Sequence, residues 1–189
     1  MSEVPKTNMA EDLQFEPAVS RPDLLPPSIN ELLKNWRGAT PVEEILVAPI
    51  DAEYADSAKF CEHYGVNPKD GANCVVAVAV RGENRTFAAC LIPVNCRADL
   101  NNTARKTLGA KKISFAPLDE VLAETKMEYG GITPLGLPEN YPILIDSRIA
   151  EMKRLIVGGG FRKSKLSVPG KVLAELPNAV IVENLGREI

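Results

Sequence analysis

The stretch Asn73-Cys-Val-Val-Ala-Val-Ala-Val80, followed by the turn Arg81-Gly-Glu-Asn84 and then by the run from Arg85 to Val94, decides the fold. The first run is apolar on both of its faces, and the turn that follows it is polar and contains a glycine. Continuous apolar runs of this length are typical of strands covered on both sides, and short glycine turns join antiparallel strands. We therefore predict a central β-hairpin that is buried on both faces.

Helical and strand patterns alternate on either side of this hairpin. We predict helices at 29–37, 55–64, 99–108, 117–126 and 169–176, and strands at 42–50, 112–115, 142–146, 155–158, 165–168 and 179–182. The capping-box sequence Ser28-Ile-Asn-Glu31 is expected to begin the first helix, and Gly65 and Gly109 to end the second and third. The pattern predicts an α/β fold with one domain over residues 28–189.

Residues 1–27 have a different composition from the rest of the chain. They contain five prolines and scattered acids without periodicity, which predicts a disordered or loosely attached tail. The N-terminus lacks the features of a signal peptide, and no run reaches the roughly 18 apolar residues of a membrane span. We expect a cytoplasmic protein without a membrane partner.

The net charge of −3 is unevenly distributed. Residues 1–95 hold 8 Lys and Arg against 14 Asp and Glu, whereas residues 96–189 hold 14 against 11. The second half contains the basic groups Arg105-Lys106, Lys111-Lys112, Lys153-Arg154 and Arg162-Lys163 with Lys165. Such groups either hold phosphates on one face or are ordinary solvated surface charge.

The cysteines and the single histidine restrict the chemistry. The four cysteines, at 61, 74, 90 and 96, lack the close Cys-x-x-Cys spacing of zinc or redox motifs, so we expect reduced thiols and no metal site. His63 is two residues from Cys61 on a predicted helix, where the two side chains point to different faces. This spacing argues against a local Cys-His couple.

Two glycine-rich segments and one acidic strand end are candidates for a site. The segment Glu128-Tyr-Gly-Gly-Ile-Thr-Pro-Leu-Gly-Leu-Pro138 exposes main chain to a ligand, or else forms a tight structural connection. The segment Gly158-Gly-Gly-Phe-Arg-Lys-Ser-Lys165 is either an anion-binding nest or a glycine hairpin, and it has neither the Walker nor the dinucleotide spacing. Asp146 either is an active carboxylate or caps the next short helix.

Taken together, four segments resemble the YbaK family of aminoacyl-tRNA deacylases, which includes the editing insertion domain of bacterial prolyl-tRNA synthetases. The resemblance covers roughly residues 40–185, and the segments that carry it are Lys106–Lys112, Gly130–Gly136, Pro142–Asp146 and Ile156–Gly160.

The resemblance implies a mixed, largely antiparallel, barrel-like β-sheet with flanking helices around a small pocket. The pocket would receive the aminoacylated 3′ end of tRNA and hydrolyse the ester of a mischarged amino acid, acting in trans and without a cofactor or metal. Editing of this kind is needed because a pocket for one small side chain rejects a near-isostere by only ~1–3 kcal/mol. An aminoacyl-tRNA synthetase is a further candidate partner.

The resemblance also implies roles for individual residues. Main-chain groups of Gly131 and Ile132 would position the ester carbonyl or the attacking water, within a loop completed by Gly130 and Thr133 and stiffened by Pro134. Asp146, Gly158 and Gly159 would line the pocket. Arg162 and Lys163 are placed where cations could meet tRNA phosphates.

The chain departs from the family pattern at the start of the first central strand. A lysine that would hold the terminal phosphate is replaced there by Asn73, and the nearest lysine is Lys69. Loss of one well-placed electrostatic contact costs about 10²- to 10³-fold in rate. Either another cation substitutes, with Arg97 and Lys112 as candidates, or the substrate differs, or the activity is weak. The alternative function is a non-catalytic module that binds tRNA ends or an aminoacyl metabolite.

Overall fold

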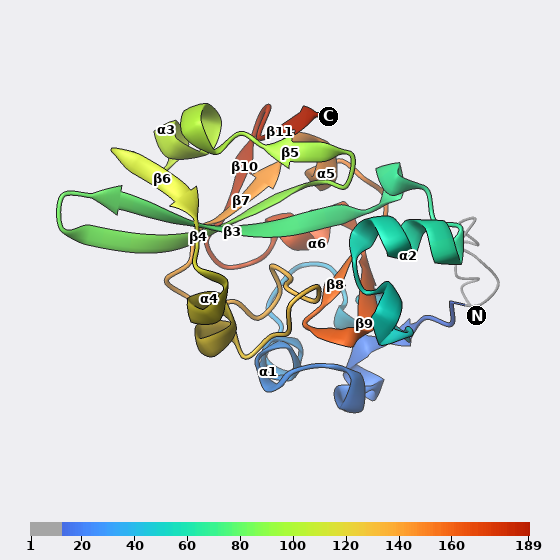
Figure 1. Ribbon diagram of the computed structural model, residues 1–189. Helices are drawn as coiled ribbons and strands as arrows, with labels where there is room; N and C mark the ends of the chain where they lie inside the picture. Colours follow the sequence, from blue (N-terminus) through green and yellow to red (C-terminus); the bar gives the residue numbers. More distant parts are fainter. Residues whose placement is uncertain (1–12) are drawn as a thin grey trace.

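The computed structural model describes residues 13–189 and is organised around one long hairpin (Figure 1). Strands β3 (Ala72–Arg81) and β4 (Asn84–Pro93) pair in register from Ala72↔Pro93 to Arg81↔Asn84. Gly82 in the turn has φ +61°, a left-handed conformation that favours glycine. The hairpin predicted from the sequence is confirmed.

The alternating side chains of β3 enter three hydrophobic clusters, two on one side of the strand and one on the other. Cys74, Val76 and Val78 pack on the side that holds the largest part of the core, whereas Val75 and Ala77 pack on the other side. Since successive side chains of a strand point to opposite faces, both faces of the hairpin are covered.

The strands form three separate sheets. The five-stranded main sheet has the order β10-β7-β4-β3-β6, and a four-stranded sheet has the order β1-β2-β9-β8. A third sheet pairs β11 with β5. The remaining strands are β1 (Glu16–Pro17), β2 (Leu46–Pro49), β5 (Cys96–Ala98), β6 (Lys112–Phe115), β7 (Ile143–Asp146), β8 (Leu155–Gly159), β9 (Phe161–Val168), β10 (Ala179–Val182) and β11 (Gly186–Glu188).

This arrangement is mixed and largely antiparallel, as predicted. Only the β4–β7 and β7–β10 pairs within these sheets are parallel. The barrel-like closure expected from the resemblance is wrong, because β6 and β10 form the two open edges of the main sheet.

Short helices cover the sheets. They are α1 (Pro27–Lys34), α2 (Ser57–Tyr64), α3 (Arg105–Thr107), α4 (Leu118–Thr125), α5 (Ser147–Ala150) and α6 (Gly170–Ala174). A π-helical turn (Leu100–Ala104) leads into α3, and 3₁₀ turns lie at Ala18–Ser20, Pro22–Leu24, Val42–Glu44, Ala52–Tyr54 and Pro68–Asp70. Within residues 13–189, none of the helices has the length and apolarity needed to cross a membrane.

The start of α1 differs from the predicted capping box. The helix begins at Pro27, with Pro26 as its N-cap, so Ser28 lies inside the first turn and its hydroxyl is buried without a partner among residues 13–189. Proline is well suited to the first helical position because its fixed φ is helical and its missing N–H would be unpaired there anyway. The capping-box prediction is therefore wrong.

The segment before α1 is part of the folded domain. Strand β1 pairs with β2, and Ala18, Leu24 and Leu25 are buried in the main hydrophobic cluster. The Ser164 hydroxyl donates a hydrogen bond of 2.9 Å to the Leu24 carbonyl oxygen. The predicted loosely attached tail is wrong for residues 13–27, because these apolar side chains fill the core; residues 1–12 lie outside the described part of the chain.

Asp146 joins three elements at the end of β7. Its carboxylate is fully buried, accepts hydrogen bonds from Nε and Nη2 of Arg148 at 2.8 and 2.9 Å, and accepts the Gly186 N–H at 2.8 Å. It also caps α5 by accepting the Arg148 N–H at 3.0 Å. Burial alone would raise the pKa of Asp146, but the Arg148 guanidinium and these N–H groups outweigh it and lower that pKa.

Truncation of Leu25 tests the packing of the N-terminal segment. Leu25 is 2% exposed, so Leu25→Ala should lower the free energy of unfolding in urea by about 2–5 kcal/mol. The control Val19→Ala shortens a side chain of the same segment that is 42% exposed, and should change the free energy of unfolding by less than about 0.5 kcal/mol. Equal effects of the two substitutions would contradict this packing.

Substitution of Asp146 tests the ion pair. Asp146→Asn should lower the free energy of unfolding at neutral pH by about 1.5–3 kcal/mol, the range for hydrogen bonds to charged groups. The folded-state pKa is lowered, so this stabilisation is present above the unfolded pKa of about 3.9 and is lost as the pH falls through the folded pKa. Urea denaturation across that pH range should show the variant and parent converging in acid, and the exposed control Asp119→Asn should have little effect. A gap that persists at the acid end would contradict the assignment.

Candidate functional site

Two glycine segments that are distant in sequence meet on one side of the main sheet. The Gly160 N–H donates to the Gly131 carbonyl oxygen at 2.7 Å, and the Glu128 N–H donates to the Gly160 carbonyl oxygen at 2.8 Å. The structure thus brings together the two segments that the sequence singled out. We call the contact between residues 128–132 and 158–160 the glycine junction.

The junction requires bare main chain at two positions. A Cβ atom at Gly131 would lie 2.7 Å from the Gly160 carbonyl oxygen, and a Cβ atom at Gly158 would lie 2.6 Å from the Gly131 carbonyl oxygen. Contacts this short do not occur for real side chains, so any larger residue would push the two chains apart. Gly159 is similarly enclosed by Ser164 of β9.

The junction also presents hydrogen-bond donors. The Gly131 N–H is used within its own turn, where it donates to the Glu128 carbonyl oxygen at 2.9 Å. The N–H groups of Ile132 and Thr133 have no acceptor among residues 13–189, and the buried Thr133 hydroxyl also lacks a partner there. Thr133 is fully buried, whereas Ile132 is partly exposed, so the Ile132 N–H is the free main-chain donor that can bind a carbonyl or anionic oxygen.

Arg162 holds the junction to the loop before α2. Its main-chain N–H donates to the Glu128 carboxylate at 2.9 Å, while its guanidinium donates to the carbonyl oxygens of Tyr129 at 2.9 Å and Ala52 at 2.8 Å. These bonds engage Arg162 in positioning three segments, whereas the sequence predicted contact with phosphates.

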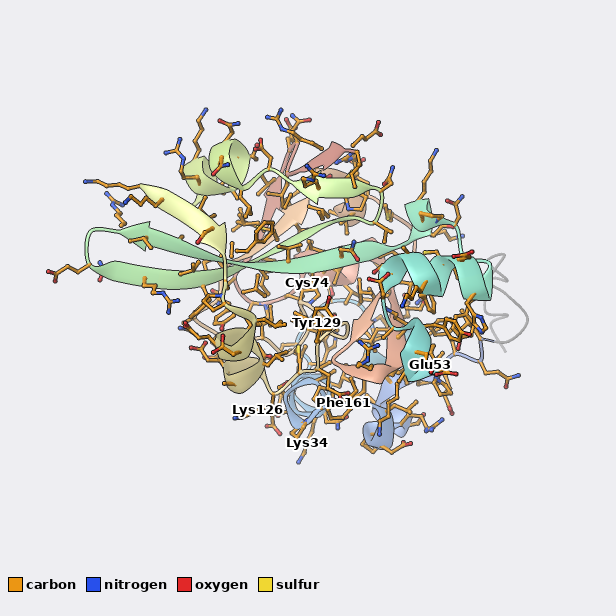
Figure 2. All side chains as sticks on the ribbon, in the orientation of Figure 1. Lys34, Glu53, Cys74, Lys126, Tyr129 and Phe161 are labelled. Atoms are coloured by element: carbon orange, nitrogen blue, oxygen red, sulfur yellow. The ribbon has the colours of Figure 1, made fainter. Side chains whose placement is uncertain are left out.

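Aromatic and basic side chains surround the junction at the surface. Figure 2 labels Tyr129 and Phe161, which lie below β3 in that view, with Cys74 on β3 above them. Tyr129 is 63% exposed, and the exposed Lys163 places Nζ 5.4 Å from the Phe161 ring centroid. Neither Arg162 nor Lys163 belongs to an ion pair within residues 13–189, but the Arg162 guanidinium is held by carbonyl oxygens whereas the Lys163 side chain is exposed.

Lys165, which the sequence placed in a basic group and in a candidate anion-binding nest but not among the site residues, lies beside the junction. Lys165 is directly opposite Gly158 in the β8–β9 pair, and opposed residues of antiparallel strands point to the same face. It is 4% exposed, and its Nζ donates to the Ala55 carbonyl oxygen at 2.7 Å and lies 5.1 Å from the Phe60 ring centroid. Burial lowers the pKa of Lys165 to about 8.

Sequence reasoning missed Lys165 for a physical reason. The strand pattern at 165–168 predicted an extended segment, but a strand alone does not reveal which face is buried. The face is decided by the pairing of β9 with β2 and β8 and by the packing of α2 against it.

Asn73, at the position where the family pattern has a lysine, is tied to the same region. Its side-chain oxygen accepts a hydrogen bond from the Ser57 hydroxyl at the start of α2. Ser57 and Lys165 both line a narrow cavity between α2, β3 and β8, with a volume of about 10 Å³. That is roughly the space of one water molecule, and Lys165 is one of the side chains that fill the rest.

Other predicted site residues lie elsewhere. Lys112 is paired with Val80 near the far end of β3, seven residues from Asn73, or about 23 Å at 3.3 Å per residue. Arg97 lies on β5 opposite Arg187. Pro134 lines a separate groove with residues of α1, including Leu32. Neither Arg97 nor Lys112 is brought to the glycine junction.

Asp146 has the capping role that the sequence left open beside a catalytic one. Both of its oxygens are occupied by Arg148 and Gly186, so the carboxylate has no vacant position from which to activate a water without breaking the ion pair.

Few side chains among residues 13–189 are suited to act as a catalytic nucleophile or to bind a metal ion. His63 is stacked on Tyr54 with ring centroids 3.6 Å apart. The four cysteines are free, and burial raises the pKa of Cys90 to about 12. No cluster of three His, Cys, Asp or Glu side chains suited to a metal occurs within residues 13–189. The main-chain donors and cations at the junction are therefore the groups available for chemistry.

Comparison with known proteins identifies a protein family that the chain matches. A family model described as an aminoacyl-tRNA editing domain matches residues 51–176. The chain is 26% identical over 98 residues to an Enterococcus faecalis protein named "Putative Cys-tRNA(Pro)/Cys-tRNA(Cys) deacylase EbsC", covering 52% of this chain and 59% of that protein. It is 27% identical over 99 residues to the uncharacterized protein YwhH of Bacillus subtilis, covering 52% of this chain and 62% of that protein. The chain thus spans about three fifths of the length of these curated relatives.

Solved structures share the fold. The crystal structure of a "putative trans-editing enzyme for prolyl tRNA synthetase" aligns with a TM-score of 0.69 at 20% identity, over 87% of this chain and 99% of that one. The crystal structure of a hypothetical protein aligns with a TM-score of 0.67 at 21% identity, over 85% of this chain and 99% of that one. Since the family model matches about two thirds of the sequence, the resemblance seen in the sequence is confirmed, and the chain belongs to the aminoacyl-tRNA editing domain family.

Proposed function

We propose that this chain hydrolyses the ester bond of a mischarged aminoacyl-tRNA. The observation that carries the proposal is the glycine junction, where two main chains touch and leave the N–H groups of Ile132 and Thr133 without a protein acceptor among residues 13–189. Donors fixed in this way stabilise an oxygen that becomes negatively charged, and each is worth about 10²- to 10³-fold in rate.

In the proposed reaction the ester carbonyl oxygen accepts a hydrogen bond from the N–H of Ile132, which is the partly exposed residue of the two; Thr133 is fully buried. The oxygen of a water molecule bonds to the carbonyl carbon, and the carbonyl oxygen carries the negative charge of the tetrahedral intermediate. Collapse breaks the bond to the ribose oxygen, which takes one proton from the water, while the amino acid leaves as a carboxylate and the second proton passes to solvent. The protein contributes position and electrostatics to these steps.

The substrate side of the proposal rests on the name of a relative and on charge, since the cavity lined by Ser57 and Lys165 has room for only about one water molecule and does not distinguish amino acids. The E. faecalis relative is named for Cys-tRNA, so cysteine belongs among the candidates. The exposed Lys163, beside the aromatic rings of Tyr129 and Phe161, supplies a cation and stacking surfaces for the single-stranded tRNA end.

Deacylation of a panel of tRNAs charged with glycine, alanine, serine or cysteine tests the proposal. The parent should hydrolyse at least one member, and Gly131→Ala should reduce that rate by about 10²-fold or more, because the new Cβ displaces the Gly160 main chain. Gly82→Ala is the matched control: its φ of +61° strains the hairpin turn, but nothing lies within 4 Å of the new Cβ.

Two outcomes would contradict the proposal. If the parent binds charged tRNA ends but hydrolyses none of the panel, the chain is a binding module. If Gly131→Ala and Gly82→Ala lose activity equally, in proportion to their loss of stability, the junction has no special part in the reaction.

A further inference from the structure

Lys165 is a buried ammonium that no carboxylate neutralises. It belongs to none of the ion pairs formed within residues 13–189, and its one hydrogen bond goes to the Ala55 carbonyl oxygen. A buried charge without a partner of opposite sign is unfavourable, and an apolar residue of the same size is usually at least as stable there. Folding alone therefore does not account for a lysine at this position.

The side chain of Lys165 lies on the face of the β8–β9 pair where the junction is formed. Gly158 lies opposite Lys165, and the space where its Cβ would be is occupied by the carbonyl groups of Gly131 and Ile132. Ala55, which accepts the Lys165 hydrogen bond, has its own Cβ 3.6 Å from the place of a Cβ at Gly130. One residue thus connects the ammonium with the glycine loop.

The ammonium has donors to spare. A lysine side chain offers three N–H donors, and the Ala55 carbonyl uses one of them. Lys165 also lines, together with Ser57, the cavity with room for about one water molecule, and Ser57 is the hydrogen-bond partner of Asn73.

We infer that Lys165 is a substrate-contacting residue whose ammonium binds an anionic oxygen of the aminoacylated tRNA end, at the position to which Asn73 brings no charge. This inference rests on the proposed function and identifies Lys165 as one of the cations that would bind the substrate. The anionic oxygen belongs either to the terminal phosphate or to the ester carbonyl as it becomes charged. Contact with the phosphate acts in the bound state, and contact with the carbonyl acts only in the transition state.

The charged and titratable groups around Lys165 come from α2 and β9. Asp56 and Cys61 of the α2 region favour its protonated form, and Arg162 of β9 disfavours it. Burial raises the pKa of the Cys61 thiol. With the pKa of Lys165 at about 8, the cation is lost as the pH rises through that value.

Lys165→Met and Lys165→Arg, measured beside the parent, test the inference. Lys165→Met should lower kcat/KM by about 10²-fold while its Tm stays equal to or above that of the parent. A fall in kcat identifies the ester oxygen, and a rise in KM identifies the phosphate. In the parent, kcat/KM corrected for uncatalysed hydrolysis should fall above about pH 8, and in Lys165→Arg this fall should disappear because arginine stays protonated.

A relocated charge provides a second test. Asn73→Lys in the Lys165→Met background should restore at least a tenth of the parent kcat/KM, because Asn73 and Lys165 are both anchored to the start of α2. Asn73→Gln in the same background is the uncharged control and should restore nothing.

The inference is overturned if Lys165→Met keeps kcat/KM within threefold of the parent, or if it unfolds at a lower temperature with a proportional loss of activity. Failure of the proposed function is recognised separately, as a parent that hydrolyses no member of the panel. In that case binding of a non-hydrolysable aminoacyl-amide minihelix still decides the role of Lys165: unchanged affinity of Lys165→Met overturns it, and affinity reduced tenfold or more supports it.

Discussion

Direct contact between two main chains is the constraint on which the rest of the site depends. Segments 128–132 and 158–160 approach so closely that a Cβ atom at Gly131 or Gly158 would overlap a carbonyl group of the other segment. Hydrogen bonds from Gly160 to Gly131 and from Glu128 to Gly160 hold the contact. A site made of main chain is fixed more firmly than one made of long side chains, because it has no rotamers to order. The N–H groups of Ile132 and Thr133, which have no acceptor among residues 13–189, belong to the loop that makes this contact.

The cations near this contact differ in what the fold does with them. Arg162 donates to carbonyl oxygens of Tyr129 and Ala52 and so joins the junction to the loop before α2. Lys165 is buried and has a single hydrogen bond to Ala55, with donors left over. Lys163 remains exposed beside Phe161. Strand β9 therefore carries three cations in different environments. Arg162 positions loops, Lys165 is buried, and Lys163 is exposed at the surface.

The region matched by the family model begins at residue 51, yet the elements before it support the site. Pro26 and Ile29 lie where a Cβ at Gly160 would be, and Ser164 of β9 donates to Leu24. Strand β2 pairs with β9 along Pro49↔Ser164 and Ala48↔Lys165. Elements within residues 13–50 thus pack against Gly160 and β9 (Figure 1). A substitution that shifts them would therefore shift β9 and the glycine junction.

The sequence by itself determined the buried hairpin of residues 73–94, most of the helices and strands, and the two glycine segments as candidates, because apolar periodicity and glycine are local signals. It misjudged residues 13–27, where proline suggested a tail and burial of Leu24 and Leu25 made a core segment. Only the tertiary structure decided that Gly131 meets Gly158, that Asp146 is paired with Arg148, that Lys112 lies far from Asn73, and that Lys165 is the buried lysine beside the junction. These facts depend on strand partners and register, and the side of a strand that is buried is set by contacts with residues distant in the chain.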